Sequence, residues 1–318
     1  MSWPKRGGAK IGAAGMAGSR SSSVRTDGGS SVTPTLEVLS MRLGAPVFED
    51  CSTPELWIAA VKRKGYSAAF CPVGPETSDD VVQAWAKAAR DADVVIAEVG
   101  AWSNPLAPDP EAARAAIEHC KTQLYLADRI GAACCVNIAG SRGQIWDGPH
   151  PANLTKETFE LIVETVREII DAVQPTRTYY TLETMPWMYP DSADSYLALI
   201  QAVDRPAFAV HFDPVNLVNC PARWADTGSL IRDFVERLGP WIRSCHAKDV
   251  TLAPRLTVHI DEVRPGLGVL DYRTYLVCLD SLGDDVPLMI EHLGSEQDYD
   301  EAATYIRAIA AEVGVTIR

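Results

Sequence analysis

The sequence of 318 residues predicts an α/β protein in which eight parallel strands alternate with eight helices to form a closed (β/α)8 barrel, the TIM barrel. Strand-like and helix-like segments alternate between residues 36 and 313. The strand-like segments are continuous apolar runs, which is typical of strands covered on both faces. Strict alternation of this kind produces a parallel sheet. A doubly wound open sheet is the alternative, but no Gly-rich phosphate-binding motif follows the first strand-like segment.

The first four strand–helix units have recognisable helix boundaries. Thr53 followed by Pro54 marks the start of the first helix, Gly131 closes the third, and Thr155 opens the fourth. The expected strands cover 36–44, 66–73, 93–102 and 132–140, and the expected helices cover 53–65, 78–91, 109–131 and 155–173.

The last four units follow the same alternation. Their expected strands cover 178–186, 207–216, 242–250 and 286–293, and their helices cover 192–202, 228–238, 272–282 and 299–313. After the seventh strand, residues 255–266 alternate Leu256, Val258 and Ile260 with Thr257, His259 and Asp261. This pattern predicts a short extra strand that leans a polar face, including His259, over the barrel mouth as a lid.

The first 34 residues differ in composition from the rest of the chain. They are rich in Gly, Ser and Arg and have no apolar period, so we expect residues 1–34 to be a disordered tail and residues 35–318 to form a single barrel domain. The tail has five basic residues against one acidic residue. A misassigned start codon upstream of the true one would produce the same composition.

Charge and cysteine usage restrict the classes of partner. The net charge is −13, and an acidic surface repels phosphate backbones, which argues against nucleic acid as a partner. No apolar run of 18 residues is present, so no membrane-spanning helix is expected. The eight cysteines lack CxxC spacing, which favours free thiols in a reducing compartment and predicts a cytoplasmic protein.

Four predicted strands each end with an ionisable residue. These are Glu183, Asp213, His246 and Glu291, after strands five to eight. The strands are neighbours in a barrel, whose active sites lie at the carboxyl ends of the strands. Three carboxylates packed together raise one another's pKa unless a cation holds them, and carboxylates with one imidazole suit Mn²⁺, Mg²⁺ or Co²⁺. Separate salt bridges are the alternative.

Other polar residues at the same strand ends are candidate site residues. Lys248 is expected to supply positive charge to a substrate oxyanion or to pair with a carboxylate. Asp249 is expected to orient His246 or Lys248. His211 lies two residues before Asp213 and is expected to assist at the site, with a satisfied core histidine as the alternative.

The loops after strands three to six contain half of the eight tryptophans. Trp102, Trp146, Trp187 and Trp224 would form indole walls for sugar rings or an aromatic aglycone, with simple loop packing as the alternative. In the loop after strand four, Arg142 is an expected substrate contact, together with His150.

Five motifs in this order, "LETMPW", "HFDPVN", "CHAKD", "RPGLGVLDY" and "IEHL", resemble the xylose-isomerase-like TIM barrel superfamily. That superfamily contains ketose 3-epimerases, hydroxypyruvate isomerase, inosose dehydratase and apurinic endonucleases. The resemblance implies that one divalent metal, with Mn²⁺ the most favoured, is bound by Glu183, Asp213, His246 and Glu291. It also implies that both glutamates transfer protons. It also implies that Asn216 contacts substrate, in place of the histidine found in the epimerases. An amide still forms hydrogen bonds but does not shuttle protons.

These observations predict a metal-dependent sugar isomerase or epimerase that abstracts a proton next to a carbonyl. The alternative is a metal-dependent lyase or dehydratase that acts by β-elimination on a keto-sugar, a keto-glycoside or an inosose. A metallonuclease is less favoured because extra histidines and a basic surface are missing, and a non-catalytic sugar-binding protein has no need of four ligands. The expected partner is a sugar or glycoside, and the resemblance also implies homo-oligomers.

Overall fold

The computed structural model describes residues 40–283 and 285–318. The expected tail over 1–34 and residues 36–39 of the first expected strand lie outside the described residues. The first strand begins at Arg42, and Met41 adds an isolated parallel bridge to Ile317 near the end of the chain.

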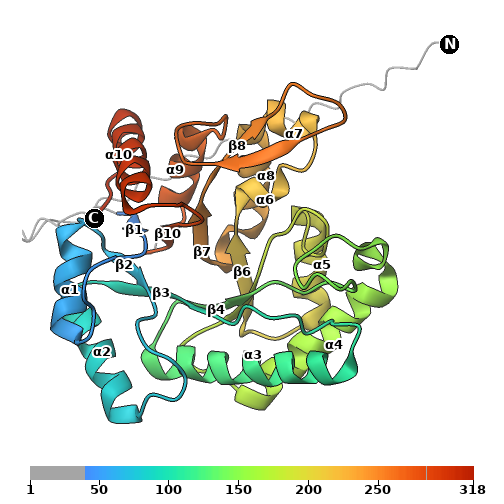
Figure 1. Ribbon diagram of the computed structural model, residues 1–318, viewed down its shortest axis with the longest axis horizontal. Helices are drawn as coiled ribbons and strands as arrows, with labels where there is room; N and C mark the ends of the chain where they lie inside the picture. Colours follow the sequence, from blue (N-terminus) through green and yellow to red (C-terminus); the bar gives the residue numbers. More distant parts are fainter. Residues whose placement is uncertain (1–39, 284) are drawn as a thin grey trace, which may run out of the picture. The chain divides into compact units, whose positions relative to one another are not determined.

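Eight parallel strands close into a barrel in the order β1-β10-β7-β6-β5-β4-β3-β2 (Figure 1), which confirms the predicted fold. Strand β10 is the eighth of the barrel, because β8 and β9 form a separate two-stranded sheet. The barrel strands are β1 Arg42–Gly44, β2 Ala68–Phe70, β3 Val95–Gly100, β4 Cys134–Asn137, β5 Tyr180–Glu183, β6 Phe208–Phe212, β7 Ile242–Ala247 and β10 Pro287–Ile290.

The eight expected helices are all present outside the ring of strands (Figure 1). They are α1 Pro54–Arg63, α2 Asp79–Asp91, α3 Pro110–Ile130, α4 Lys156–Val173, α5 Ala193–Val203, α8 Thr227–Leu238, α9 Tyr272–Asp280 and α10 Glu296–Val313. Helix α3 shows how local sequence sets the boundaries. The Asp109 carboxylate accepts hydrogen bonds from the first turn, and Gly131 ends the helix at φ 75°.

Short helical segments that the apolar pattern did not predict lie in the loops. They are α6 Pro214–Leu217, α7 Pro221–Ala225, η1 Pro151–Leu154 and η2 Gly239–Trp241. Each begins with or contains a proline in its first turn, where the missing N–H leaves no extra donor unpaired. Of these, α6 matters most, because it starts directly after Asp213 at the end of β6.

The apolar core between strands and helices anchors the ends of β6 and β7. Phe212 of β6 stacks on Phe234 of α8 with ring centroids 4.1 Å apart, and Tyr275 of α9 packs edge-on against Phe212. The Tyr275 hydroxyl also donates to the carbonyl of His246 at 2.9 Å. Because these groups are fully buried, the backbone that carries Asp213 and His246 is held in place by packing.

A buried arginine paired with two exposed carboxylates closes the amino-terminal end of the barrel. Arg42 is 3% exposed, and its guanidinium contacts the carboxylates of Asp93 at 2.7 Å and Asp285 at 2.9 Å. The hydrogen bond from Arg42 lowers the pKa of Asp93 below its usual value. This end of the barrel is therefore a structural element, far along the strands from the candidate site.

The extra strand after β7 lies within the predicted segment but is shorter. The pattern covers residues 255–266, whereas β9 spans Ile260–Val263 and pairs antiparallel with β8, Asp249–Leu252. The register joins Leu252 to Ile260, so residues 253–259 make the connection, and Leu256 is 96% exposed. Leu256 and Val258 thus belong to an exposed turn, and Ile260 is the first residue of β9.

The cysteines and helices agree with the compositional analysis. All eight cysteines are free thiols in the described part of the chain. Among the described residues, no helix has the length and apolar character needed to cross a membrane.

Candidate active site and metal centre

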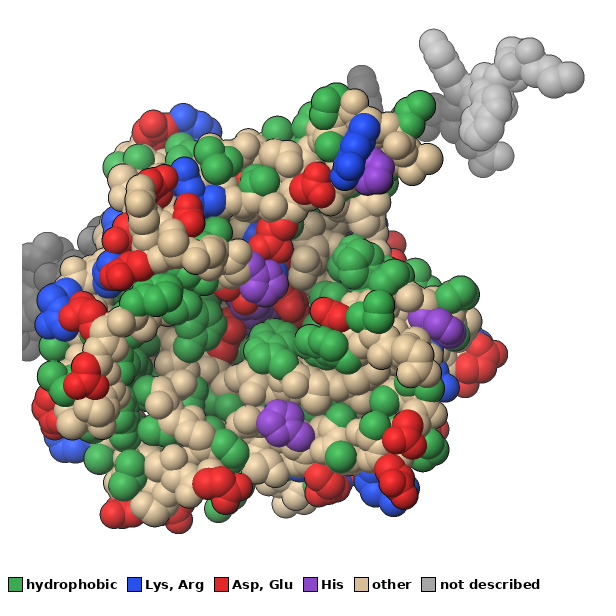
Figure 2. Space-filling view, in the orientation of Figure 1, with side chains coloured by type: hydrophobic (Ala, Val, Ile, Leu, Met, Phe, Trp, Pro, Cys, Tyr) green, Lys and Arg blue, Asp and Glu red, His purple; other side chains and the backbone are tan. Residues whose placement is uncertain are grey.

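The carboxyl ends of the barrel strands surround a hollow in the molecular surface (Figure 2). Hydrophobic side chains form much of its walls, and acidic, basic and histidine side chains gather at its centre. The cavity has a volume of about 590 Å³, which is in the range of small-molecule binding sites. Its polar lining includes Glu183, Asn216, Lys248 and Glu291.

The four predicted metal ligands converge at the floor of this cavity. Their strands are neighbours in the order β10-β7-β6-β5. The Nδ1 atom of His246 lies 2.9 Å from Glu183 Oε1, 2.8 Å from Glu291 Oε1 and 3.6 Å from Asp213 Oδ2. One oxygen or nitrogen atom from each of the four residues lies within 4.8 Å of the others.

The two carboxylate oxygens of Asp213 make different contacts, one with the helix α6 and one with the cluster. Its Oδ1 caps α6 by accepting the N–H groups of Val215 and Asn216 at 2.9 and 3.3 Å. This leaves Oδ2 facing the cluster. The Thr184 hydroxyl donates to the Asp213 carbonyl at 2.7 Å and accepts from its N–H at 3.1 Å. The sequence Asp213-Pro214 is therefore a helix cap that also orients a ligand.

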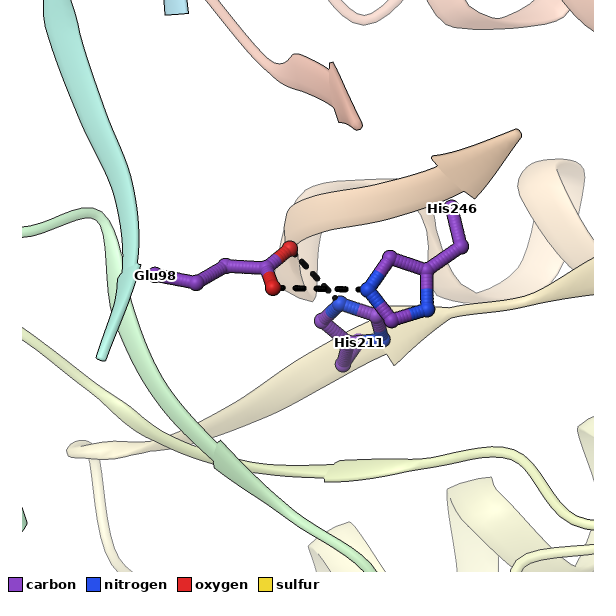
Figure 3. Close-up of side chains that lie close together, drawn as sticks. All are labelled: Glu98, His211 and His246. Carbon is purple, nitrogen blue, oxygen red and sulfur yellow. Dashed lines mark hydrogen bonds and ion pairs between the residues drawn. The ribbon is translucent and has the colours of Figure 1, made fainter. Parts of the chain in front are cut away.

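Glu98 of β3 is a site residue that the sequence analysis missed. Its buried carboxylate lies 3.3 Å from Nε2 of His246 and 2.9 Å from Nε2 of His211 (Figure 3), and the Ser244 hydroxyl also donates to it. Burial alone would raise the pKa of Glu98, but the two imidazoles hold it well below its usual value. A carboxylate that fixes Nε2 leaves Nδ1 of His246 for the cluster.

His211 lies beneath the cluster rather than in the cavity. It is fully buried, its ring packs edge-on against His246 with centroids 4.1 Å apart, and it does not line the cavity. His211 therefore assists the site from beneath the cluster, and it is not among the residues that line the cavity. Residues two apart on a strand share a face, but the earlier one lies deeper in the barrel, and here it supports Glu98 and His246.

Lys248 lies among the carboxylates. Its side chain is 2% exposed, and its Nζ atom is 2.6 Å from Glu291 Oε1, 2.8 Å from Asp213 Oδ2 and 3.5 Å from Glu183 Oε1. Burial acts to lower the pKa of Lys248, but the surrounding carboxylates raise it well above its ordinary value. The ammonium therefore balances part of the negative charge of the cluster.

Asp249 does not orient His246 or Lys248, contrary to the prediction. Its carboxylate accepts backbone N–H groups at 2.8–3.1 Å from Val250, Gly266, Gly268 and Leu270. Adjacent residues of an extended chain point to opposite sides, so Asp249 faces away from the cluster. A Cβ on Gly268 would lie 2.3 Å from Asp249 Oδ1, which explains the second glycine of "RPGLG".

The donor set fits one divalent cation. Oδ2 of Asp213 and Oε1 of Glu291 are buried acceptors without a hydrogen bond in the described part of the chain, although Lys248 forms ion pairs with both. Burial opposes the charge on His246, yet the carboxylates raise its pKa well above the ordinary value. Ligand atoms within 4.8 Å of one another match a single ion with bonds of about 2.1–2.5 Å.

Four of the other predicted contacts line the cavity. Asn216 donates from Nδ2 to Glu183 Oε1 at 3.3 Å, and Trp102 and Trp187 form parts of the wall, as does Trp146. Trp224 lies in α7 and packs against the apolar core instead. The loops after strands three to five thus supply indoles to the cavity, and the loop after strand six does not.

Arg142 and His259 are not among the residues that line the cavity, so their contact with substrate stays a prediction. The Arg142 guanidinium donates to the Leu106 carbonyl at 3.2 Å, which ties together the loops after β3 and β4. His259 is half-buried just before β9, with Nε2 3.4 Å from the Leu256 carbonyl. Both lie in long loops, where sequence alternation does not determine which way a side chain points.

Two further residues at the mouth were missed. His292 follows Glu291 at φ 60° and lines the cavity, and Glu262 of β9 lies 3.3 Å from its Nδ1 atom. Glu262 Oε2 is also 3.9 Å from the Lys248 ammonium. The sequence contained signals for two of the three missed residues. The motif "IEHL" contains His292, and "VIAEVG" contains Glu98 as the one charge in an apolar strand. The extra strand does reach the site, through Glu262 rather than His259.

Comparison with known proteins agrees with this architecture. A model of the xylose isomerase-like TIM barrel family matches residues 58–309. A 3-dehydroshikimate dehydratase of Bacillus anthracis is 26% identical over 142 residues, 45% of this chain and 46% of that protein. The chain thus matches about half the length of this relative.

Two solved structures illustrate the structural likeness. D-psicose 3-epimerase with D-tagatose from Clostridium cellulolyticum H10 has a TM-score of 0.62 at 17% identity, covering 86% of this chain and 100% of that chain. A xylose isomerase-like TIM barrel protein from Mycobacterium smegmatis, in complex with magnesium, has a TM-score of 0.59 at 18% identity, covering 86% and 97%. Since the family model spans most of the chain, the protein belongs to the xylose isomerase-like TIM barrel family.

Proposed function

We propose that this protein is a divalent-metal-dependent sugar isomerase or epimerase that moves a proton on the carbon next to a carbonyl group. The observation that supports this most strongly is the cluster of Glu183, Asp213, His246 and Glu291 at the floor of the cavity. Two of its carboxylates line the cavity from strands β5 and β10, which flank the other two strands of the cluster. Proton removal and return from different sides requires two such groups.

Glu183, Asp213, His246 and Glu291 would hold the ion, with Mn²⁺ as the expected metal and Mg²⁺ or Co²⁺ as alternatives. When bound, the metal supplies positive charge that polarises the substrate's carbonyl and neighbouring hydroxyl oxygens. The oxygen-rich donor set supports a hard cation over a thiolate-binding one, because the cluster contains no cysteine.

The chain's own groups would carry the proton. Glu183 would remove it from carbon, while the Asn216 amide holds Glu183 Oε1 in position. Glu291 would return it from the other side of the substrate, and the adjacent charge of Lys248 would keep the Glu291 carboxylate ionised. Burial acts to raise the pKa of Glu291, but the charges of His246 and Lys248 lower it to about 2, so Glu291 is ionised at neutral pH.

A lyase or dehydratase is the second candidate function. It begins with the same proton removal and then expels a leaving group from the neighbouring carbon. The match to a 3-dehydroshikimate dehydratase favours this candidate, as does the apolar wall of the cavity. The hydrogen-bonded His292 and Glu262 at the mouth lie where a leaving group would need a donor.

A product panel separates the two candidates. The full-length protein is incubated with Mn²⁺, and in parallel after metal removal by a chelator, with a set of ketoses, keto-glycosides and an inosose. An isomerase or epimerase converts a substrate to a product of the same mass, whereas a lyase releases water or an aglycone. Metal-independent turnover would contradict the metal-dependent proposal for either reaction.

A further inference from the structure

We infer that the substrate joins a hydroxylated, carbonyl-bearing part to a flat apolar group of the aryl class. The hydroxylated, carbonyl-bearing part follows from the proposed function. The apolar group is inferred from the hydrophobic wall of the cavity. The two halves of the cavity differ in chemistry. Glu183, Lys248 and Glu291 come from the ends of β5, β7 and β10. The ends of β2, β3 and β4 supply an apolar wall, and Trp187 of the loop after β5 extends this wall beside the loop after β4.

The strand order separates these halves across the mouth of the barrel. Strands β10, β7, β6 and β5 are consecutive around the ring, and β4, β3 and β2 follow them. Phe70 ends β2, Trp102 follows β3, and Trp146 follows β4. A substrate that reaches the polar floor therefore meets aromatic side chains on its other side.

The indoles are exposed and at least one of them is fixed in orientation. Trp102, Trp146 and Trp187 are 42%, 41% and 41% exposed, although all three line the cavity. The Trp187 Nε1–H donates to the Asp147 carbonyl at 2.8 Å. That hydrogen bond satisfies the polar edge of Trp187 and joins the loops after β4 and β5. Exposed aromatic faces gathered in a cavity are typical of a ligand-binding wall.

A small sugar alone does not suit this wall. A free ketose has hydroxyl groups around its whole length, and each one that enters the cavity must find a hydrogen-bond partner. On the apolar side, the charged side chain that lines the cavity is Asp147. A flat apolar ring needs no such partners and stacks on an indole with additional attraction. The cavity of about 590 Å³ also has room for a second ring beside the reacting part.

Binding calorimetry with the full-length, Mn²⁺-supplemented protein tests this inference without turnover. The ligands are phenyl β-D-glucopyranoside and methyl β-D-glucopyranoside, which differ in the apolar group alone. We expect the phenyl glycoside to bind about 10–100-fold more tightly, the scale of burying one aromatic side chain. Equal affinities, or no binding of either ligand, would overturn the inference.

Matched variants locate the effect. Trp146→Ala and Trp187→Ala should reduce the phenyl preference to a few-fold, and Trp146→Phe should keep most of it because a flat ring remains. Tyr125→Ala, an exposed aromatic residue on α3 that does not line the cavity, should leave it unchanged. A preference that survives both tryptophan-to-alanine variants overturns the inference. If the wild-type protein prefers the phenyl glycoside but transfers no proton on any substrate, the proposed function alone is refuted.

Discussion

Glu98 lies 3.3 Å from Nε2 of His246, and this contact makes Nδ1 the atom that His246 presents to the carboxylate cluster. The same carboxylate accepts from His211 and Ser244, so its position is fixed from three sides. A carboxylate behind a metal-binding histidine sets the tautomer and the ring orientation. The ligand geometry therefore depends on a residue of β3, on the opposite side of the barrel from β7.

Replacing Glu98 should weaken metal binding without removing a ligand. For Glu98→Gln we expect a loss of about 10–100-fold in Mn²⁺ affinity, the usual scale for a residue that orients a ligand. Isothermal titration calorimetry, with Mn²⁺ added to the metal-free protein, measures the affinity. Glu164→Gln, on the exposed face of α4, is the matched control. Unchanged affinity in Glu98→Gln would show that packing alone orients His246.

His246→Ala should remove bound metal while the barrel still folds. The imidazole is the one nitrogen ligand of the cluster, and its loss also leaves a small space beside Glu98. Elemental analysis of the purified variant gives the metal content, and circular dichroism reports the fold. Full metal occupancy in a folded His246→Ala protein would rule out this centre.

Lys248→Met should destabilise the metal-free protein more than the metal-loaded one. Without the ammonium, the buried carboxylates of Asp213 and Glu291 repel each other, and breaking a buried ion pair costs about 3–5 kcal/mol. A bound divalent ion restores positive charge at the same place and should offset most of this loss. Thermal unfolding of the variant with chelator and with Mn²⁺ measures the difference.

Lys87→Met serves as the control for that experiment, because its ion pair with Asp91 is exposed. It should change the melting temperature little in either condition. Equal destabilisation of Lys248→Met with and without metal would mean that Lys248 has a packing role and does not balance the cluster.

Asp93→Asn should lower the free energy of unfolding in a pH-dependent way. The pKa of Asp93 is lowered by Arg42, so its contribution is present above the ordinary value of 3.8 and is lost as the pH falls below it. Because Asp93 is mostly exposed, we expect on the order of 1 kcal/mol at neutral pH. Asparagine tolerates the left-handed backbone of this position, φ 51°.

Denaturant unfolding of wild type and Asp93→Asn between pH 7 and pH 3 measures that effect. The two unfolding free energies should converge as the pH falls. A difference that stays constant over this range would show that Arg42 interacts with the backbone carbonyl of Asp93 and hardly with its carboxylate.

The barrel and the convergence of Glu183, Asp213, His246 and Glu291 were predictable because both depend on short-range patterns. Apolar strand segments end at the mouth, so residues such as Glu183 and Asp213 directly after a buried run must lie there. Glu98 was missed because it belongs to the middle of a strand and acts on His246 of β7, a relationship that no local pattern reports. Long-range contacts of this kind come from barrel closure.

The sequence could not determine the side-chain directions of Asp249 and His259. Asp249 was assigned to the site by proximity to Lys248, but the extended backbone turns it toward Gly266 and Gly268. His259 was assigned by alternation, and the hairpin register instead brings Glu262 to the mouth. In both cases the residue type was reasonable, and the pairing register of β8 and β9 decided the outcome.

Deuterium incorporation is the most direct test of the proposed proton transfer. An active substrate from the product panel is turned over in D₂O with Mn²⁺, and the product is analysed by NMR and mass spectrometry. An isomerase or epimerase should place deuterium on the carbon that changes, and a lyase should release a leaving group. Glu183→Gln and Glu291→Gln should each reduce turnover about 10²–10⁴-fold. Turnover without deuterium or a leaving group, with both variants fully active, would contradict the account.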